Sequence, residues 1–81
     1  MVVRAIALCK LEMGVSKKVI EELRKITQIK KIMSLTGDYD VLAEIEVDTS
    51  EELFEIFSEK IDMIQGIIAS NTHVIMKAWE K

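Results

Sequence analysis

Four stretches of the chain have the dense or alternating apolar pattern of β-strands. Residues 2–12 are rich in apolar groups, and their charged side chains all fall on one parity. Residues 29–36 form a second apolar stretch, which Gly37 interrupts. In residues 41–47 every odd position is apolar, and residues 67–79 end the chain with β-branched and aromatic side chains. We predict a strand at each of the four, with the second and third joined as a hairpin.

Two further stretches repeat their apolar residues at helical spacing, and each begins at a candidate cap. Ser16 is positioned to cap the first helix, and Thr49 with Glu52 three residues later forms a capping box for the second. The apolar positions of the first helix are Val19, Ile20, Leu23 and Ile26. Those of the second are Leu53, Phe54, Ile56, Phe57 and Ile61. We expect Gly66 to end the second helix.

The order of these elements is βαββαβ, and the two halves resemble each other. Ser16, Ile20 and Leu23 recur as Ser50, Phe54 and Phe57 at a constant offset, which indicates two βαβ units. Right-handed crossovers place both helices on the same side of the sheet. The predicted fold is therefore α+β and ferredoxin-like, with a four-stranded antiparallel sheet and two helices on one face.

This arrangement leaves one face of the sheet uncovered, although that face also carries apolar side chains. Ile6 and Leu8 share the parity of charged neighbours in the first strand, and Leu42 does so in the third. In the last strand Val74 and Met76 are expected to oppose Ile75 and Trp79, so either parity leaves apolar groups exposed. We interpret this face as a subunit interface that forms a dimeric α+β barrel; the alternative is scattered surface hydrophobes, which are common.

Size and composition narrow the class of protein. A chain of 81 residues with 49% hydrophobic residues forms one domain with one core, residues 1–81. Its net charge of −3 disfavours direct nucleic-acid binding. The single Cys9 indicates a reducing compartment and reads as a buried small hydrophobe. No apolar run reaches the roughly 20 residues of a membrane span, so we expect a cytoplasmic protein with no membrane partner.

The turn Thr36-Gly37-Asp38-Tyr39-Asp40 is the most distinctive short segment. Gly and Asp suit a tight connection on conformational grounds alone, whereas an aromatic ring at a hairpin tip gains little unless it packs on a ligand or another chain. Backbone N–H groups around Gly37 can receive a carboxylate, and Asp38 or Asp40 can balance an ammonium group. A tight structural turn and a binding loop for a zwitterion such as an amino acid both remain open.

The chain resembles the regulatory, effector-binding (RAM) domain of the Lrp/AsnC family of transcription regulators. The resemblance rests on the TGDYD turn with the strand VLAEIEVD, on the helix start TSEEL and on the last segment GIIASNTHVIMKAW, and it spans essentially the whole chain. It implies sheet-to-sheet dimers that assemble into octamer or decamer rings, with amino-acid effectors bound between dimers. By the same resemblance Gly37, Asp38, Tyr39 and Asp40 belong to the effector loop, and Ser70 and Thr72 approach the same cleft.

The chain departs from full-length members of that family because it starts at the first strand, without a helix-turn-helix domain. We therefore expect a stand-alone sensing domain that acts through effector-dependent oligomerisation. A second possibility is a structural partner domain that co-assembles with full-length regulators and binds no ligand.

An enzymatic alternative is a small monooxygenase-like dimeric barrel, for which His73, Asn71, Trp79 and Tyr39 would be the candidate polar groups. A lone histidine in a strand is usually a structural residue, and no acid, base or nucleophile accompanies it at a recognisable spacing. We expect no enzyme activity and no cofactor. The acidic residues Glu44, Glu46, Asp48, Glu51 and Glu52 follow from strand alternation and the helix cap, so we expect no metal either.

Overall fold

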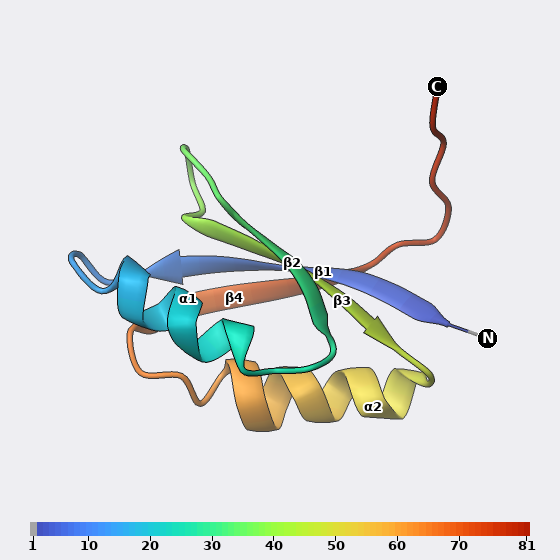
Figure 1. The fold of residues 1–81 in the computed structure, drawn as a ribbon, viewed down its shortest axis with the longest axis horizontal. Helices are drawn as coiled ribbons and strands as arrows, with labels where there is room; N and C mark the ends of the chain where they lie inside the picture. Colours follow the sequence, from blue (N-terminus) through green and yellow to red (C-terminus); the bar gives the residue numbers. More distant parts are fainter. Residues whose placement is uncertain (1) are drawn as a thin grey trace.

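The computed structural model describes residues 2–81, and its elements follow the predicted βαββαβ order (Figure 1). The sheet strands are β1 (Val3–Leu11), β2 (Ile29–Ser34), β3 (Val41–Val47) and β4 (Ile67–Val74). The helices are α1 (Ser16–Arg24) and α2 (Ser50–Glu55), which continues as a π-helix, η1 (Ile56–Ile61). The first three predicted strands lie within two residues of the observed bounds.

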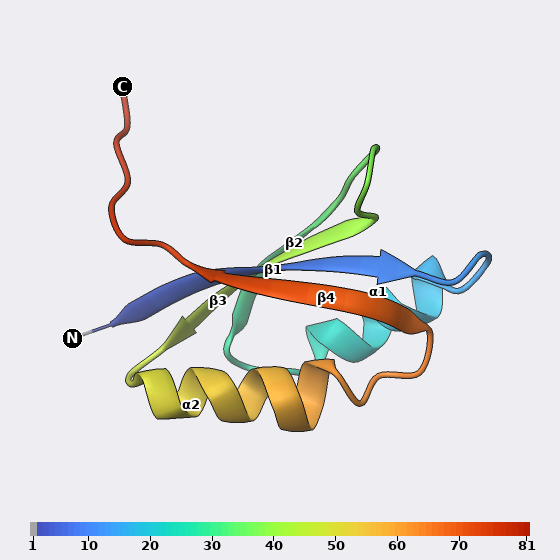
Figure 2. The same ribbon diagram turned by 180° about the vertical axis from the view of Figure 1, so that it is seen from behind.

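The strands form one sheet in the order β2-β3-β1-β4, and every neighbouring pair is antiparallel. Both helices lie on the same side of this sheet, while its other side carries none of the helices of residues 2–81 (Figures 1 and 2). The predicted α+β, ferredoxin-like fold with two helices on one face is confirmed.

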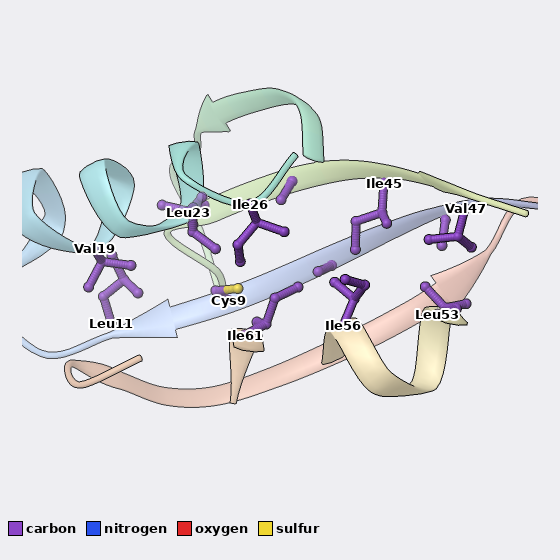
Figure 3. Close-up of a cluster of buried hydrophobic side chains, with 14 residues drawn as sticks. Cys9, Leu11, Val19, Leu23, Ile26, Ile45, Val47, Leu53, Ile56 and Ile61 are labelled. Carbon is purple, nitrogen blue, oxygen red and sulfur yellow. The ribbon is translucent and has the colours of Figure 1, made fainter. Parts of the chain in front are cut away.

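Strand alternation decides which side chains enter the core. The odd positions of β1 and β3 face the helices and all but the half-buried Val3 are buried, whereas the even positions point to the opposite side, here called the open face. Val19 and Leu23 of α1 and Leu53, Ile56 and Ile61 of the second helical segment complete the core (Figure 3). The central residues Ala5, Ala7 and Ala43 are at most 1% exposed, and their small side chains leave room for bulkier helix residues above them.

The two helix starts differ from each other. At the second, the Thr49 hydroxyl accepts a hydrogen bond from the Glu52 N–H at 3.1 Å, which confirms the Thr49 half of the predicted capping box. The Glu52 carboxylate accepts from the Asp48 N–H and not from the Thr49 N–H that the box required. At the first, the prediction was wrong: Ser16 is already the first helical residue, and Val15 occupies the capping position without a side-chain hydrogen bond. A serine inside the first turn has passed the position at which its hydroxyl could accept from that turn's N–H groups.

The second helix ends earlier than predicted, at Ile61, and Gly66 lies beyond it. The last part of the helix is π-helical: its backbone bonds join residues five apart, and the Asp62 N–H donates to the Phe57 carbonyl at 2.9 Å. Ile56 and Ile61, also five apart, are thereby both buried. Phe54, predicted on the apolar stripe, is instead 70% exposed.

The last strand stops at Val74, so the predicted strand over 67–79 was too long. Val74 pairs with Ala5, and the Ile75 N–H still donates to the Arg4 carbonyl at 2.8 Å, but β1 has few residues left to pair beyond that point. Met76 and Trp79 therefore lie in an irregular tail. The prediction that they lie in the sheet, on opposite faces of the last strand, was wrong. This tail leaves the sheet on the open-face side (Figure 1).

Of Gly37 and Gly66, two of the three glycines with positive φ, Gly66 should tolerate substitution by alanine less well. Gly37 and Gly66 have φ of +105° and +107°. A Cβ on Gly66 would lie 2.9 Å from a Val15 methyl carbon and 3.1 Å from one of Val19, whereas a Cβ on Gly37 meets nothing within 4 Å. We expect Gly37→Ala to lower the free energy of unfolding by about 1 to 3 kcal/mol through backbone strain. Gly66→Ala should cost about 1 to 3 kcal/mol more because of overpacking. Urea unfolding measures both, and equal losses would contradict the steric account.

Glu52 should make stability depend on pH. The Asp48 N–H donates to its carboxylate at 2.9 Å and Gln28 donates at 3.2 Å, and these bonds, the first more strongly, lower the pKa of Glu52. The unfolded chain has a glutamate pKa of about 4.3. The stabilisation is therefore complete above that pH and is lost as the pH falls through the lower native pKa.

Urea unfolding midpoints measured from about pH 7 down to about pH 3 should fall less steeply for Glu52→Gln than for the wild type. Glu51→Gln is the matched control, because Glu51 lies in the same helical turn without these two hydrogen bonds. If both variants follow the wild-type curve, the two bonds contribute nothing to stability.

Candidate functional site

The loop that joins β2 to β3, residues 35–40, rises on the open-face side of the sheet (Figure 1). Its tip contains Gly37, whose positive φ of +105° permits the sharp reversal that a residue with a side chain would resist. The loop closes on itself through a backbone hydrogen bond of 2.8 Å from the Leu35 N–H to the Asp40 carbonyl. The segment predicted as a turn is therefore a turn.

Asp40 ties this loop to the central strand. Its carboxylate accepts a hydrogen bond from the Leu11 N–H at 2.8 Å, and its own N–H donates to the Cys9 carbonyl at 2.9 Å. The carboxylate thus reaches the end of β1, next to an irregularity in the β1–β4 pairing between Lys10 and Leu11. A half-buried carboxylate used in this way braces the backbone, and of the two aspartates Asp40 is the less available to a ligand.

Asp38 and Tyr39 are held from two different strands. Lys10 of β1 donates through Nζ to the Asp38 carbonyl oxygen at 3.3 Å. Asn71 of β4 donates through Nδ2 to the Tyr39 hydroxyl. Within residues 2–81 the Asp38 carboxylate makes no hydrogen bond or ion pair and is exposed. The loop therefore presents one free carboxylate on a tip anchored at Lys10, Leu11 and Asn71.

Sequence reasoning did not identify Lys10 as a loop anchor and considered Asn71 only as part of an enzyme site. The signal that would have revealed them is strand register. Asn71 lies directly opposite Leu8 on the open face, and Lys10 lies on the same face two residues along β1. Neither pairing can be read from one sequence without the structure.

Ser70 and Thr72, the other two predicted site residues, point to the opposite side of the sheet. They are partnered in register with Cys9 and Ala7, whose side chains face the helices. The Ser70 hydroxyl donates to an Asp62 carboxylate oxygen at 2.6 Å, while Thr72 Oγ1 is buried with no hydrogen-bond partner in residues 2–81. Within one chain the structure does not bring this pair together with the Gly37–Asp40 loop.

A groove runs beside Ser70 and Thr72 between the second helix and β4. It has a volume of about 430 Å³, and its walls include Leu53, Phe54 and Phe57. The groove is mainly apolar and lies along the free edge of the sheet, since β4 pairs only with β1. It could hold an apolar side chain more readily than a charged group.

The open face combines an apolar centre with charged flanks. Leu8, Leu42 and Met33 lie side by side in register across β1, β3 and β2, and Ile6 adjoins them. All four are half-buried by their neighbours on the sheet. Arg4 and Glu46, a cross-strand pair, border this group. The predicted uncovered apolar surface is therefore present.

The remaining polar candidates do not form a reaction centre. His73 is exposed opposite Ile6 on the open face, and Trp79 lies in the tail, where Lys77 Nζ stands 5.4 Å from its ring centre. Burial, assisted by the nearby Asp62 carboxylate, raises the pKa of the Cys9 thiol to about 11, so this thiol is protonated at neutral pH. Residues 2–81 contain no cluster of three or more metal-ligating side chains, and none of their helices has the length and apolar character to span a bilayer.

A profile of the Lrp/AsnC ligand binding domain matches residues 4–81. The chain belongs to this family. Among curated proteins, the HTH-type transcriptional regulator FL11 of Pyrococcus furiosus is 32% identical over 73 residues, which are 90% of this chain and 48% of FL11. The homocitrate synthase of Sulfurisphaera tokodaii is 32% identical over 59 residues, 73% of this chain but 13% of that enzyme.

The chain thus spans about half the length of the regulators that it matches. Because these are named as transcription regulators and the homocitrate synthase match covers a small part of that enzyme, membership points to a regulatory domain and not to a catalytic one.

Solved structures agree with this membership. The crystal structure of FFRP-DM1 superposes with a TM-score of 0.88 at 27% identity, covering 91% of this chain and 99% of that one. A transcriptional regulator from Neisseria meningitidis, solved as a complex of NMB0573 with L-Met, superposes with a TM-score of 0.82 at 14% identity, covering 98% of this chain and 53% of that one. At 14% identity, the match to the Neisseria regulator shows similarity of fold alone.

The two aspartates of the loop should differ in their importance for stability. Asp40→Ala removes a charge-assisted hydrogen bond and leaves the Leu11 N–H unpaired, which should lower the free energy of unfolding by about 1.5 to 3 kcal/mol. Asp38→Ala, at an exposed carboxylate, should change it by less than about 0.5 kcal/mol. Denaturant unfolding of both variants checks this, and a larger loss for Asp38→Ala would reverse the roles given to the two side chains.

Proposed function

We propose that this Lrp/AsnC domain senses a free amino acid at the β2–β3 loop and that binding shifts the assembly of its subunits. One observation carries the proposal. In residues 2–81 the N–H groups of Gly37, Asp38 and Tyr39 donate to no protein acceptor, and the unpaired Asp38 carboxylate lies beside them. Free donors next to a free acid complement the carboxylate and ammonium of a zwitterion.

The loop is braced before any ligand arrives, which favours recognition. Asp40 fixes its base, Asn71 holds Tyr39, and Lys10 holds the Asp38 backbone. A ligand that meets an ordered loop does not have to supply the free energy of ordering it. The L-Met in the Neisseria structure of the same fold agrees with an amino acid as the ligand class.

A single chain offers only half of such a site, because the loop tip is exposed and nothing in residues 2–81 covers it. We propose that a neighbouring subunit supplies the second half. Ser70 and Thr72 are suited to this role, because they line the groove at the sheet edge and the Thr72 hydroxyl has no partner in its own chain. The effector would then lie between subunits, and its binding would favour the assembly that completes the site.

The apolar centre of the open face supports a dimer formed through the sheets. Leu8, Leu42 and Met33 form a continuous strip that no helix covers. The tail with Met76 and Trp79, 96% and 79% exposed, leaves the sheet on the same side and would be covered by a second sheet packed there. Pairs of this kind would build the octamer or decamer ring.

The domain would act inside the cell as a regulatory module, alone or together with full-length regulators of its family. Both helices of residues 2–81 pack on the sheet, so neither is free to enter a DNA groove. The match to a short part of a homocitrate synthase supports a domain of this type that works beside other kinds of output domain. The proposed role is sensing, without catalysis or direct DNA contact.

The competing role is a partner domain that binds no ligand. The hydrogen bond from Asn71 to the Tyr39 hydroxyl favours this partner role, because the hydroxyl oxygen already accepts a bond within its own chain. In that case the loop would contact protein, and its free donors would meet carbonyl groups of another subunit.

Isothermal titration calorimetry against the twenty amino acids, with sedimentation velocity on the same samples, distinguishes the two roles. Sensing predicts saturable heat with one or a few amino acids and a change in the mass of the assembly. Asp38→Ala should weaken binding by about tenfold to a hundredfold, since a lost charged hydrogen bond is worth about 1.5 to 3 kcal/mol.

Glu59→Ala is the control, because Glu59 is an exposed acid of η1, on the helix side of the sheet, and this variant should bind as the wild type does. An absence of heat across the whole panel would reject the sensing role and leave the partner role. If Asp38→Ala binds the amino acid as tightly as the wild type, the binding site is not at this loop.

A further inference from the structure

The sheet has two free edges, and they differ in charge. β2 and β4 each pair with a single neighbour, so the outer side of each strand is open in residues 2–81. β2 contains Lys30 and Lys31 and no acid, whereas β4 contains no lysine, arginine, aspartate or glutamate. α1 lies beside β2 and adds Arg24 to the same edge. The β2 edge therefore concentrates positive charge on a chain whose net charge is −3.

The β2 edge borders a hollow between α1 and β2 that we call the basic groove, with a volume of about 480 Å³. Its lining includes three half-buried isoleucines, Ile20, Ile29 and Ile32, and three exposed cations, Arg24, Lys30 and Lys31. Within residues 2–81 the ion pair joins Lys25 to Glu22, so none of the three cations has a carboxylate partner there. Lys30 donates from Nζ to the Thr27 carbonyl oxygen at 3.0 Å, a bond that leaves its charge unneutralised.

The backbone of β2 offers unpaired hydrogen-bonding groups along the same edge. In an antiparallel pair, alternate residues direct their N–H and C=O groups toward the neighbouring strand and the others direct theirs away from it. The Leu35 N–H donates to the Asp40 carbonyl at 2.8 Å, and counting back in register assigns Met33 to the bonds with β3. Ile32 and Ser34 therefore direct their backbone groups outward, where residues 2–81 supply no partner.

The charge of this edge disfavours pairing with a second copy of the chain. Two β2 edges side by side would bring Lys30 and Lys31 of both copies together, and like charges on adjacent strands are destabilising. The free β4 edge carries no acid, and the tail that follows it has Lys77 and Lys81 against Glu80. Neither free edge nor the tail supplies the acidic extended segment that these cations would favour.

We propose that the β2 edge binds an acidic, extended segment of another protein, which adds to the sheet as a further strand. Its backbone would bond to Ile32 and Ser34. Side chains of a strand alternate between its two sides. Ile32 pairs with Ala43 and so points to the helix side, where apolar side chains of the segment would enter the basic groove. Acidic side chains on the other side would face Lys31, which lies opposite Glu44 in register without an ion pair.

Strand addition suits this surface because main-chain hydrogen bonds provide affinity while alternate side chains provide specificity. The groove has no lining residue in the Gly37–Asp40 loop or in the apolar strip of the open face. The contact therefore gives the regulatory domain an attachment point for a partner protein that is separate from its effector loop and its dimer surface. It goes beyond the proposed sensing role and requires no bound amino acid.

The test uses a fluorescein-labelled synthetic peptide of alternating glutamate and valine, measured by fluorescence anisotropy without added amino acid. The anisotropy should rise to saturation, and the affinity should fall as salt rises. A peptide of alternating lysine and valine and one of alternating glutamate and serine should each bind at least about tenfold more weakly. The glutamate–valine peptide with N-methyl groups on alternate amides should lose binding by the same factor, because it keeps its charge but lacks those N–H donors.

Charge reversal of the groove is the complementary test. Arg24→Glu with Lys31→Glu should weaken binding of the glutamate–valine peptide at least about tenfold, since two attractions become repulsions. Lys18→Glu with Lys81→Glu is the matched control, because it makes the same change of charge at exposed positions outside the groove and should bind almost as the wild type does. Circular dichroism establishes that both double variants are folded.

Several results would overturn the contact. These are the absence of saturable binding, equal binding of the lysine peptide, undiminished binding of the N-methylated peptide, or equal weakening by both double variants. Sedimentation velocity without peptide adds one more: if Arg24→Glu with Lys31→Glu changes the mass of the assembly while the control does not, a second copy of the chain occupies the groove. No result here depends on the heat of amino-acid binding, so failure of this contact and failure of the sensing role can be told apart.

Discussion

The packing of two helices against one face of the sheet is the interaction on which the rest of the structure depends. The odd positions of β1 and β3 bury themselves against Val19, Leu23, Ile56 and Ile61, and this core uses every helix that residues 2–81 possess. The even positions have no such cover. One layer of helices cannot seal both faces of a sheet, so the apolar strip stays uncovered on the side where the β2–β3 loop and the tail also lie.

Sequence patterns predicted the fold well because most strand positions obey a strict alternation and the Thr49 cap uses local chemistry. They failed where the outcome depends on partners distant in sequence. β4 stops at Val74, which pairs with Ala5 near the start of β1, and the apolar character of the following residues does not reveal this. Phe54 lies outside the core because Leu53 and Ile56, three residues apart, set the buried side of the helix and Phe54 lies on another side.

The candidate site was predicted in part. The turn residues indicated where the loop lies, since Gly37 and the two aspartates favour a tight reversal in any context. The Asp40 carboxylate, and not that of Asp38, accepts from the Leu11 N–H. This difference follows from the register of the strands and could not be predicted from the sequence. The separation of Ser70 and Thr72 from the loop has the same origin, because the register that puts Asn71 on the open face puts its two neighbours on the other.

The hydrogen bond between Asn71 and Tyr39 acts as a strut across the sheet. It connects the hairpin tip to the edge strand at a residue flanked on both sides by Ser70 and Thr72. This strand borders the Phe57 groove on its other side. The tip of the β2–β3 loop and the edge strand that borders the Phe57 groove are in this way joined through a single side-chain amide.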